Sequence, residues 1–158
     1  MLVPVLDEGE ILKRARQAPT LRDVGNLAAE VLLRHFGTAS LVMTPIRSGG
    51  IMRGGRPSAR ANIERLRKTI AEFQEANIGV FNQLMFKSVI DAHRIKWRES
   101  DKSHATGYYE AILYDFYGPI LATGGVKVLF LLPGWEKSRS CKYVKRTLGK
   151  QGRVIELA

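Results

Sequence analysis

Residues 38–158 alternate between short apolar runs and longer amphipathic stretches, and this alternation limits the fold more than any other property of the chain. Val126–Leu132 is apolar except for Lys127, and its length is typical of a buried strand. Similar runs recur before and after it, bounded by glycine, asparagine or proline. The strands that these runs predict are Thr38–Ile46, Gly79–Phe86, Val126–Leu132 and Arg153–Leu157.

Strands that alternate with helices form parallel sheets with helices on both faces. The sequence therefore predicts an α/β fold: a flavodoxin-like, mainly parallel sheet of four to five strands flanked by helices. Right-handed crossovers favour the strand order 2-1-3-4. Helices are predicted over Pro57–Ala76, Thr106–Ala122 and Ser140–Lys150, and Lys87–His104 is predicted as a loop with a short helix.

The first 37 residues predict a helical extension, so the expected organisation is an extension over residues 1–37 and an α/β domain over residues 38–158. Thr20 and Asp23 are spaced as in a capping box, which predicts that a helix begins there. Gly37 is expected to end that helix.

Composition excludes several classes of protein. The chain has 158 residues, 45% of them apolar, and no apolar run approaches the length of a membrane span. Met1–Glu10 carries acids where a signal peptide would carry basic residues. One cysteine cannot form an internal disulfide, and three scattered histidines provide no metal-ligand spacing. We therefore expect a cytoplasmic protein with no membrane partner, no metal and no cofactor.

Positive charge is concentrated in two windows. Arg47–Lys68 carries seven basic residues and one acid, and Lys137–Arg153 carries seven basic residues and none. Together the windows carry +13, against +10 for the whole chain, so the remainder carries −3. Local positive charge indicates an anionic partner, either a nucleotide phosphate or a nucleic acid backbone, or else a solvated basic face.

Parallel sheets bind ligands at the carboxyl ends of their strands. Here that rule selects Thr44–Arg56, Asn82–Phe86 and Pro133–Cys141. The first segment combines four glycines, which allow close backbone approach, with arginines that bind phosphate oxygens. It is neither a Walker A loop nor a GxGxxG fingerprint, so a mobile surface loop is the alternative.

The last predicted helix begins near Ser138, which either caps it or binds a phosphate oxygen. Arg139 adds positive charge at this end. Cys141 has a setting that lowers a thiol pKa, but a small buried residue is the favoured interpretation. From the residues alone, the favoured interpretation of Asp115 is that it pairs with an arginine. The alternative is that it is a site residue.

Several segments together resemble a family of small proteins in the nucleoside 2-deoxyribosyltransferase-like superfamily. Leu132–Arg139 (LPGWEKSR) is similar to its LPGWekSrGA motif almost letter for letter. Weaker matches occur in the same order as in the family: Met43–Ile46 with a turn written aGPm, Asn62 and Leu66 with a helix written N…F…L, Val80–Gln83 with v.nP, and Asp115 with an aspartate before the third strand. The resemblance covers residues 38–158.

The resemblance implies a Rossmann-like sheet, a homodimer or larger homo-oligomer, and a nucleoside or nucleotide ligand. Catalytic members cleave the N-glycosidic bond with a glutamate nucleophile, as retaining glycosidases do. That position is Val144 here, which has no lone pair to attack a sugar. Asp115 and Glu136 are the nearby carboxylates, so they are the candidate catalytic residues if activity remains.

These observations predict a nucleotide- or nucleoside-binding protein without glycosidase activity. Ser138 and Arg139 would hold phosphate, Asp115 would contact a sugar hydroxyl, and Trp135 would stack on the base or pack the turn. An active glycosidase or deoxyribosyltransferase and a nucleic-acid-binding module are the alternatives. The candidate ligand-binding residues are Thr44, Pro45, Ser48, Gly49, Asn82, Trp135, Ser138 and Arg139.

Overall fold

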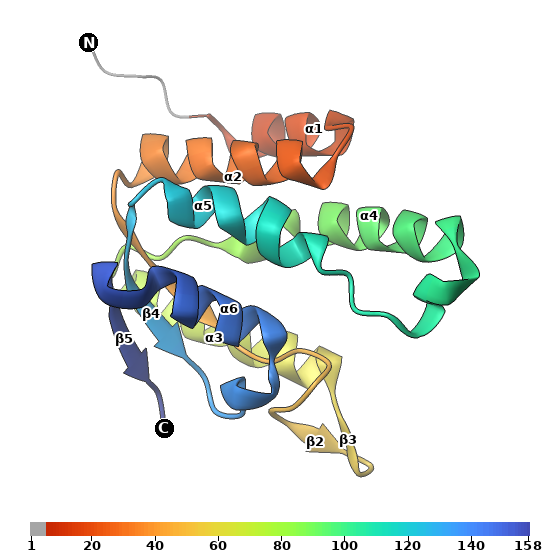
Figure 1. Cartoon of the computed structure of the whole chain (residues 1–158). Coiled ribbons are helices and arrows are strands. Elements are labelled where there is room, and N and C mark those ends of the chain that lie inside the picture. Colours follow the sequence, from red (N-terminus) through yellow and green to blue (C-terminus); the bar gives the residue numbers. More distant parts are fainter. Residues whose placement is uncertain (1–5) are drawn as a thin grey trace. The chain divides into compact units, whose positions relative to one another are not determined.

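The structure is a computed structural model that describes residues 6–158. Its elements belong to two units, each assembled from two segments of the chain (Figure 1). We call them the helical unit (Met1–Gly37 and Gln83–Thr123) and the sheet unit (Thr38–Asn82 and Gly124–Ala158). The division predicted from the sequence, into residues 1–37 and 38–158, stays a prediction, and its first five residues lie outside the described part of the chain.

The helical unit is organised around α2, which contacts α1, α4 and α5. One face of α2 is apolar at helical spacing and buried, including Val24, Ala28 and Leu32. The elements of this unit are α1 (Glu8–Gln17), α2 (Leu21–His35), the 3-10 helix η1 (Gln83–Phe86), α4 (Lys87–Ser100), the 3-10 helix η2 (Lys102–Thr106), the π-helix η3 (Ile112–Tyr117) and α5 (Gly118–Ala122).

Both predicted ends of α2 are confirmed. The Thr20 hydroxyl accepts a hydrogen bond from the Asp23 N–H at 3.2 Å and donates one to the Asp23 carboxylate at 2.7 Å. At the other end Gly37 has a φ of 69°, and its N–H donates to the Leu32 carbonyl at 3.1 Å. These bonds satisfy backbone groups that a helix leaves unpaired at its termini.

The α2 backbone approaches η3 closely at Gly25. A Cβ atom at this position would lie 2.0 Å from the carbonyl oxygen of Asp115, so the packing requires glycine. The π-helix ends where α5 begins, and Pro119 lies in the first turn of α5, where its missing N–H leaves no intrahelical bond unmade.

Two sequence predictions in this unit are wrong. Lys87–His104, expected to be mainly loop, contains the fourteen-residue helix α4. Val89 is its one buried residue, so α4 has almost no apolar stripe, and local ion pairs of Asp91 with Lys87 and Arg94 support it instead. The helix expected from Thr106 begins later, because the chain turns at Gly107 after η2.

The sheet unit contains a three-stranded parallel sheet in the order β1-β4-β5. This confirms the predicted α/β class, with helices beside a parallel sheet. The elements of this unit are β1 (Ala39–Met43), a two-stranded antiparallel ribbon of β2 (Met52–Arg53) and β3 (Arg56–Pro57), α3 (Ala59–Glu75), β4 (Val126–Leu131), the 3-10 helix η4 (Trp135–Lys137), α6 (Arg139–Leu148), the 3-10 helix η5 (Gly149–Gln151) and β5 (Arg153–Glu156).

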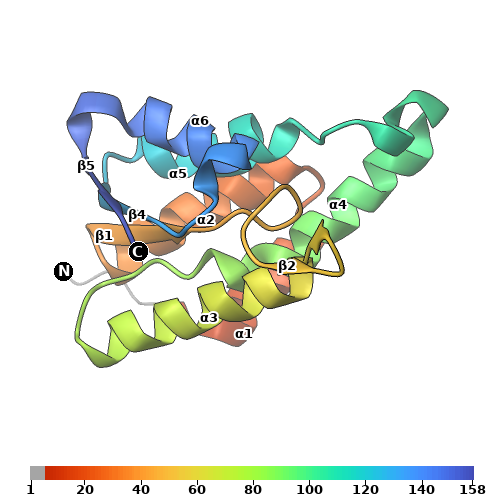
Figure 2. The same cartoon turned by 90° about the horizontal axis from the view of Figure 1, so that it is seen from below.

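Helices α3 and α6 cover opposite faces of this sheet (Figures 1 and 2). On the α3 side the rings of Phe73 and Phe130 meet edge to face, with centroids 4.8 Å apart. The α6 connection runs from β4 to β5 and the α3 connection runs toward the other edge. Crossovers of one hand that run in opposite directions place their helices on opposite faces.

The predicted strand Gly79–Phe86 is wrong in its length. Val80 forms a single parallel bridge with Ser40, beside β1, and residues 83–86 form the 3-10 helix η1. The Ser40 N–H donates to the Gly79 carbonyl at 2.7 Å, and the Phe81 N–H donates to the Ser40 carbonyl at 2.9 Å. An apolar run predicts burial, and both Val80 and Phe81 are buried, but only residues 79–81 lie along the sheet edge.

We predict that Gly25→Ala lowers the free energy of unfolding by about 2 kcal/mol, because the new methyl group overpacks the contact between α2 and η3. Urea denaturation measures this value. Gly9→Ala in α1 is the matched control: its Cβ would meet only the Asp7 side chain at 3.2 Å, and alanine favours a helix. Equal stability of the two variants would contradict the close packing.

Candidate functional site

Two loops from distant parts of the sequence meet at one edge of the sheet unit. Met43, which ends β1, pairs with Leu131, which ends β4, and the Leu132 N–H donates to the Met43 carbonyl at 2.9 Å. The segments that follow, residues 44–51 and 132–138, therefore begin side by side. This is the edge at which parallel sheets bind ligands.

Asn62 of α3 holds the first loop, residues 44–51, through hydrogen bonds to its backbone. Its side chain is fully buried, and its amide nitrogen donates to the carbonyls of Ile46 at 2.9 Å and Gly49 at 2.8 Å. Its amide oxygen accepts from the N–H of Ile51 at 2.9 Å. Three backbone groups of an irregular loop thus find partners away from water, which fixes the loop in one conformation.

The backbone of the second loop, residues 132–138, packs directly against the backbone of the first loop. Gly134 has a φ of 91°, and a Cβ atom there would lie 2.6 Å from the Gly50 nitrogen. A Cβ atom on Gly49 would lie 3.1 Å from the Lys137 Cβ. Glycine is required at position 134 both by its conformation and by the approach of the neighbouring chain.

Arg65 joins the two loops. Its Nη2 atom donates to the Thr44 hydroxyl at 2.9 Å and to the Pro133 carbonyl at 3.0 Å. Among residues 6–158 no carboxylate oxygen lies within 4.0 Å of this guanidinium, and its buried Nε atom has no hydrogen-bond partner. Burial lowers the pKa of Arg65, although arginine stays charged at neutral pH.

Sequence analysis did not select Arg65. One signal was available: Arg65 follows Asn62 by three positions and precedes the buried Leu66, so it lies on the inward side of α3. A basic residue on the inward side of a helix, at the carboxyl edge of a sheet, is unusual, because charged side chains are rarely buried without a partner.

The start of α6 lies in the second loop. Ser138 is buried, and its hydroxyl accepts from the Cys141 N–H at 3.2 Å, so it caps α6. Arg139, the first residue of the helix, is exposed. Trp135 is half-buried, and the Lys145 Nζ lies 4.5 Å from the centroid of its ring.

The inward face of α6 carries Cys141, Val144 and Leu148, all buried. Burial raises the pKa of the Cys141 thiol to about 11, so this thiol is protonated at neutral pH, as expected for a packed cysteine. Val144 has no exposed surface, so the position that carries the nucleophile in the resembling family faces protein in this chain. Glu136 is exposed in η4.

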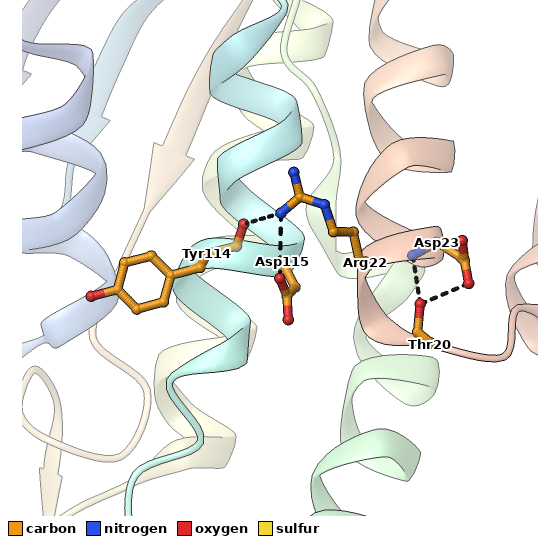
Figure 3. Close-up of polar contacts among 5 residues, drawn as sticks. All are labelled: Thr20, Arg22, Asp23, Tyr114 and Asp115. Atoms are coloured by element: carbon orange, nitrogen blue, oxygen red, sulfur yellow. Dashed lines mark hydrogen bonds and ion pairs between the residues drawn. The ribbon is translucent and has the colours of Figure 1, made fainter.

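The predicted site residues fall in both units. Asp115 lies in the helical unit, where the Arg22 guanidinium contacts its carboxylate at 3.4 Å and the Tyr114 carbonyl at 3.5 Å (Figure 3). Both side chains of this ion pair are exposed, 61% for Arg22 and 37% for Asp115, so it contributes little stability. The other predicted residues belong to the sheet unit, and those on the two loops or at the start of α6 are Thr44, Pro45, Ser48, Gly49, Trp135, Glu136, Ser138 and Arg139.

Asn82 is half-buried at the end of the segment that passes beside β1 through Val80. Within the described residues, no group of three or more His, Cys, Asp or Glu side chains is arranged to hold a metal ion. No helix of the same region is long and apolar enough to cross a membrane.

No protein-family model, curated protein or solved structure matches this chain. The likeness to the deoxyribosyltransferase-like superfamily therefore depends on the residues of this chain alone and stays a prediction. The geometry of the two loops, the burial of Val144 and the position of Arg65 are independent of that likeness.

We predict that Asn62→Ala lowers the free energy of unfolding by about 3 kcal/mol, because three backbone groups of the first loop lose their buried partner. Chemical denaturation checks the value. Asn26→Ala, at an exposed position of α2, should change stability by less than about 0.5 kcal/mol. Similar small losses for both variants would show that Asn62 does not hold the loop.

Proposed function

We propose that this protein binds a nucleotide or nucleoside at the sheet edge where β1 and β4 end, and that it does not cleave the glycosidic bond of this ligand. The observation that carries the proposal is Arg65, a partly buried cation that joins both loops and has no carboxylate within 4.0 Å among the described residues. Desolvation disfavours such a charge unless an anion compensates it. A phosphate group bound at this edge would supply that anion.

The side chains around Arg65 suit an anionic ligand. A guanidinium has five N–H donors; Nη2 already makes two bonds and Nε is buried, so the two N–H groups of Nη1 remain for a ligand. The N-terminus of α6 adds a partial positive charge, and Arg139 and Lys137 add full charges on the same loop. In this proposal Gly49 and Ser48 contact the ligand through the loop backbone, and Trp135 packs the turn.

Val144 supports binding without glycosidase chemistry. A valine cannot form a glycosyl ester, and its burial leaves no room for a reacting sugar at that position. The resemblance extends this proposal to a Rossmann-like sheet of four to five strands, with Val80 in the place of a fourth strand, and to a homodimer or larger assembly. Asp115 and Glu136 are the carboxylates to test as replacement catalytic residues.

We predict that the protein binds nucleoside monophosphates more tightly than the corresponding nucleosides, and that Arg65→Gln removes most of this difference. Loss of a charge-assisted contact to phosphate corresponds to roughly a 10- to 100-fold weaker affinity for the monophosphate. Titration calorimetry with both ligands measures the effect. Arg139→Ala should act in the same direction.

Arg67→Gln is the matched control, since Arg67 is an exposed arginine of the same helix that pairs with Glu64. It should leave both affinities unchanged. A second variant, Arg65→Lys, keeps the charge but loses the forked geometry, so it should retain part of the preference. An equal loss for phosphorylated and unphosphorylated ligands would contradict a phosphate contact at Arg65.

We also predict that the wild-type protein releases no free base from any nucleoside or nucleotide, because position 144 lacks a carboxylate. Incubation with a panel of nucleosides and nucleotides, followed by chromatography of the bases, tests this. Turnover by wild type that Glu136→Gln or Asp115→Asn abolishes would identify that carboxylate as catalytic and refute the non-catalytic function.

A further inference from the structure

The outward face of α6 carries a cluster of cations that the nucleotide site does not use. We call Lys142, Lys145 and Arg146 the α6 cluster; all three side chains are exposed. Lys145 and Arg146 follow Lys142 by three and four positions, so each is a neighbour of Lys142 on the helix surface, with about 5–6 Å between Cβ atoms. The opposite side of α6 is buried through Cys141, Val144 and Leu148.

In the described part of the chain, the α6 cluster has no acidic partner. Across residues 6–158, no carboxylate oxygen lies within 4.0 Å of any of its three cations, and residues 137–153 include no acid at all. Like charges three or four positions apart destabilise an isolated helix. The folded chain therefore keeps a repulsive arrangement that a polyanion would relieve.

Helices α1 to α4 each have cations that pair with carboxylates. In α3, Arg67 pairs with Glu64 and Lys68 with Glu72; in α4, Lys87 and Arg94 both pair with Asp91. Arg14 of α1 and Arg34 of α2 share Glu30. Helix α6 differs from α1, α2, α3 and α4 in that it contains no acidic residue.

We propose that the α6 cluster binds the phosphate backbone of a nucleic acid, without reading its base sequence. Helix α6 has ten residues and is about 15 Å long, and duplex DNA carries one charge per about 1.7 Å of its axis, so several phosphates lie within reach of the cluster. Lys145 is held against the Trp135 ring, which orders this cation without neutralising it.

The buried apolar face of α6 favours nucleic acid over a lipid surface. Helices that lie in a membrane interface insert an exposed apolar face, whereas the apolar residues of α6 pack inside the protein. The exposed cations of the α6 cluster therefore offer a partner an electrostatic contact.

The test measures binding of the full-length protein to a fluorescent 20-base-pair DNA duplex by anisotropy at several NaCl concentrations. The logarithm of the association constant should fall linearly with the logarithm of salt concentration for two duplexes of unrelated sequence. The triple variant Lys142→Gln, Lys145→Gln, Arg146→Gln should reduce the magnitude of this slope by about 3, about one per cation removed. This variant removes repulsion within a helix, so it should remain folded.

The matched control is Arg60→Gln, Arg67→Gln, Lys68→Gln on α3, which removes the same charge from exposed positions of the same unit. It should keep the wild-type slope. The proposal would be overturned if the wild-type protein did not bind the duplex at 50 mM NaCl. It would also be overturned if the control variant reduced the slope as much as the α6 variant does. Anionic phospholipid vesicles bound as tightly as the duplex through the same three cations would assign the surface to membranes instead.

The Arg65→Gln variant separates this inference from the nucleotide site. Because Arg65 lies on α3 and not in the α6 cluster, the variant should bind the duplex with the wild-type slope while losing its preference for monophosphates. If it loses both, one surface serves both ligands and the α6 cluster is not a separate site.

Discussion

The parallel pairing of β1 with β4 determines the geometry of the sheet unit. It aligns Met43 with Leu131, so the loops that follow start at the same level although they are far apart in the sequence. Asn62 and Arg65 of α3 then complete the edge, the first by fixing the loop after β1 and the second by joining both loops. If this pairing shifted by one residue, the side chains of β4 would exchange faces and α3 would lose its packing against Phe130.

Arg65 and the α6 cluster place positive charge in two different settings, and each implies a different kind of binding. Arg65 is partly desolvated and held by two loops, so it suits a single, well-placed anionic group. The α6 cluster is exposed and has no fixed hydrogen-bond geometry, so it suits a chain of phosphates and is sensitive to salt. Exposed ion pairs between side chains, such as that of Arg22 with Asp115, are weak and do not define a site.

Residues with strong local signals behave as the sequence predicts. The apolar run of β4 and the starts of α2 and α6 follow from periodicity and capping, which act over a few residues. Predictions fail where local signals are weak. Helix α4 has almost no buried stripe, and Gly79–Phe86 is apolar because it is buried, although it contributes one bridge to the sheet. In a short segment, burial and strand pairing both produce a run of apolar residues, so the run alone does not distinguish them.

The sequence alone determines that position 144 has no carboxylate, that residues 137–153 carry only positive charge, and that Ser138 can cap the helix after it. These are properties of composition and short-range spacing. Tertiary structure alone decides that Arg65 joins the loops, that Gly25 lies against the carbonyl of Asp115, and that Asp115 pairs with Arg22. Each of these contacts links segments 21 to 93 positions apart and has no periodic signal in the chain. Each depends on which strands pair and which helix faces meet.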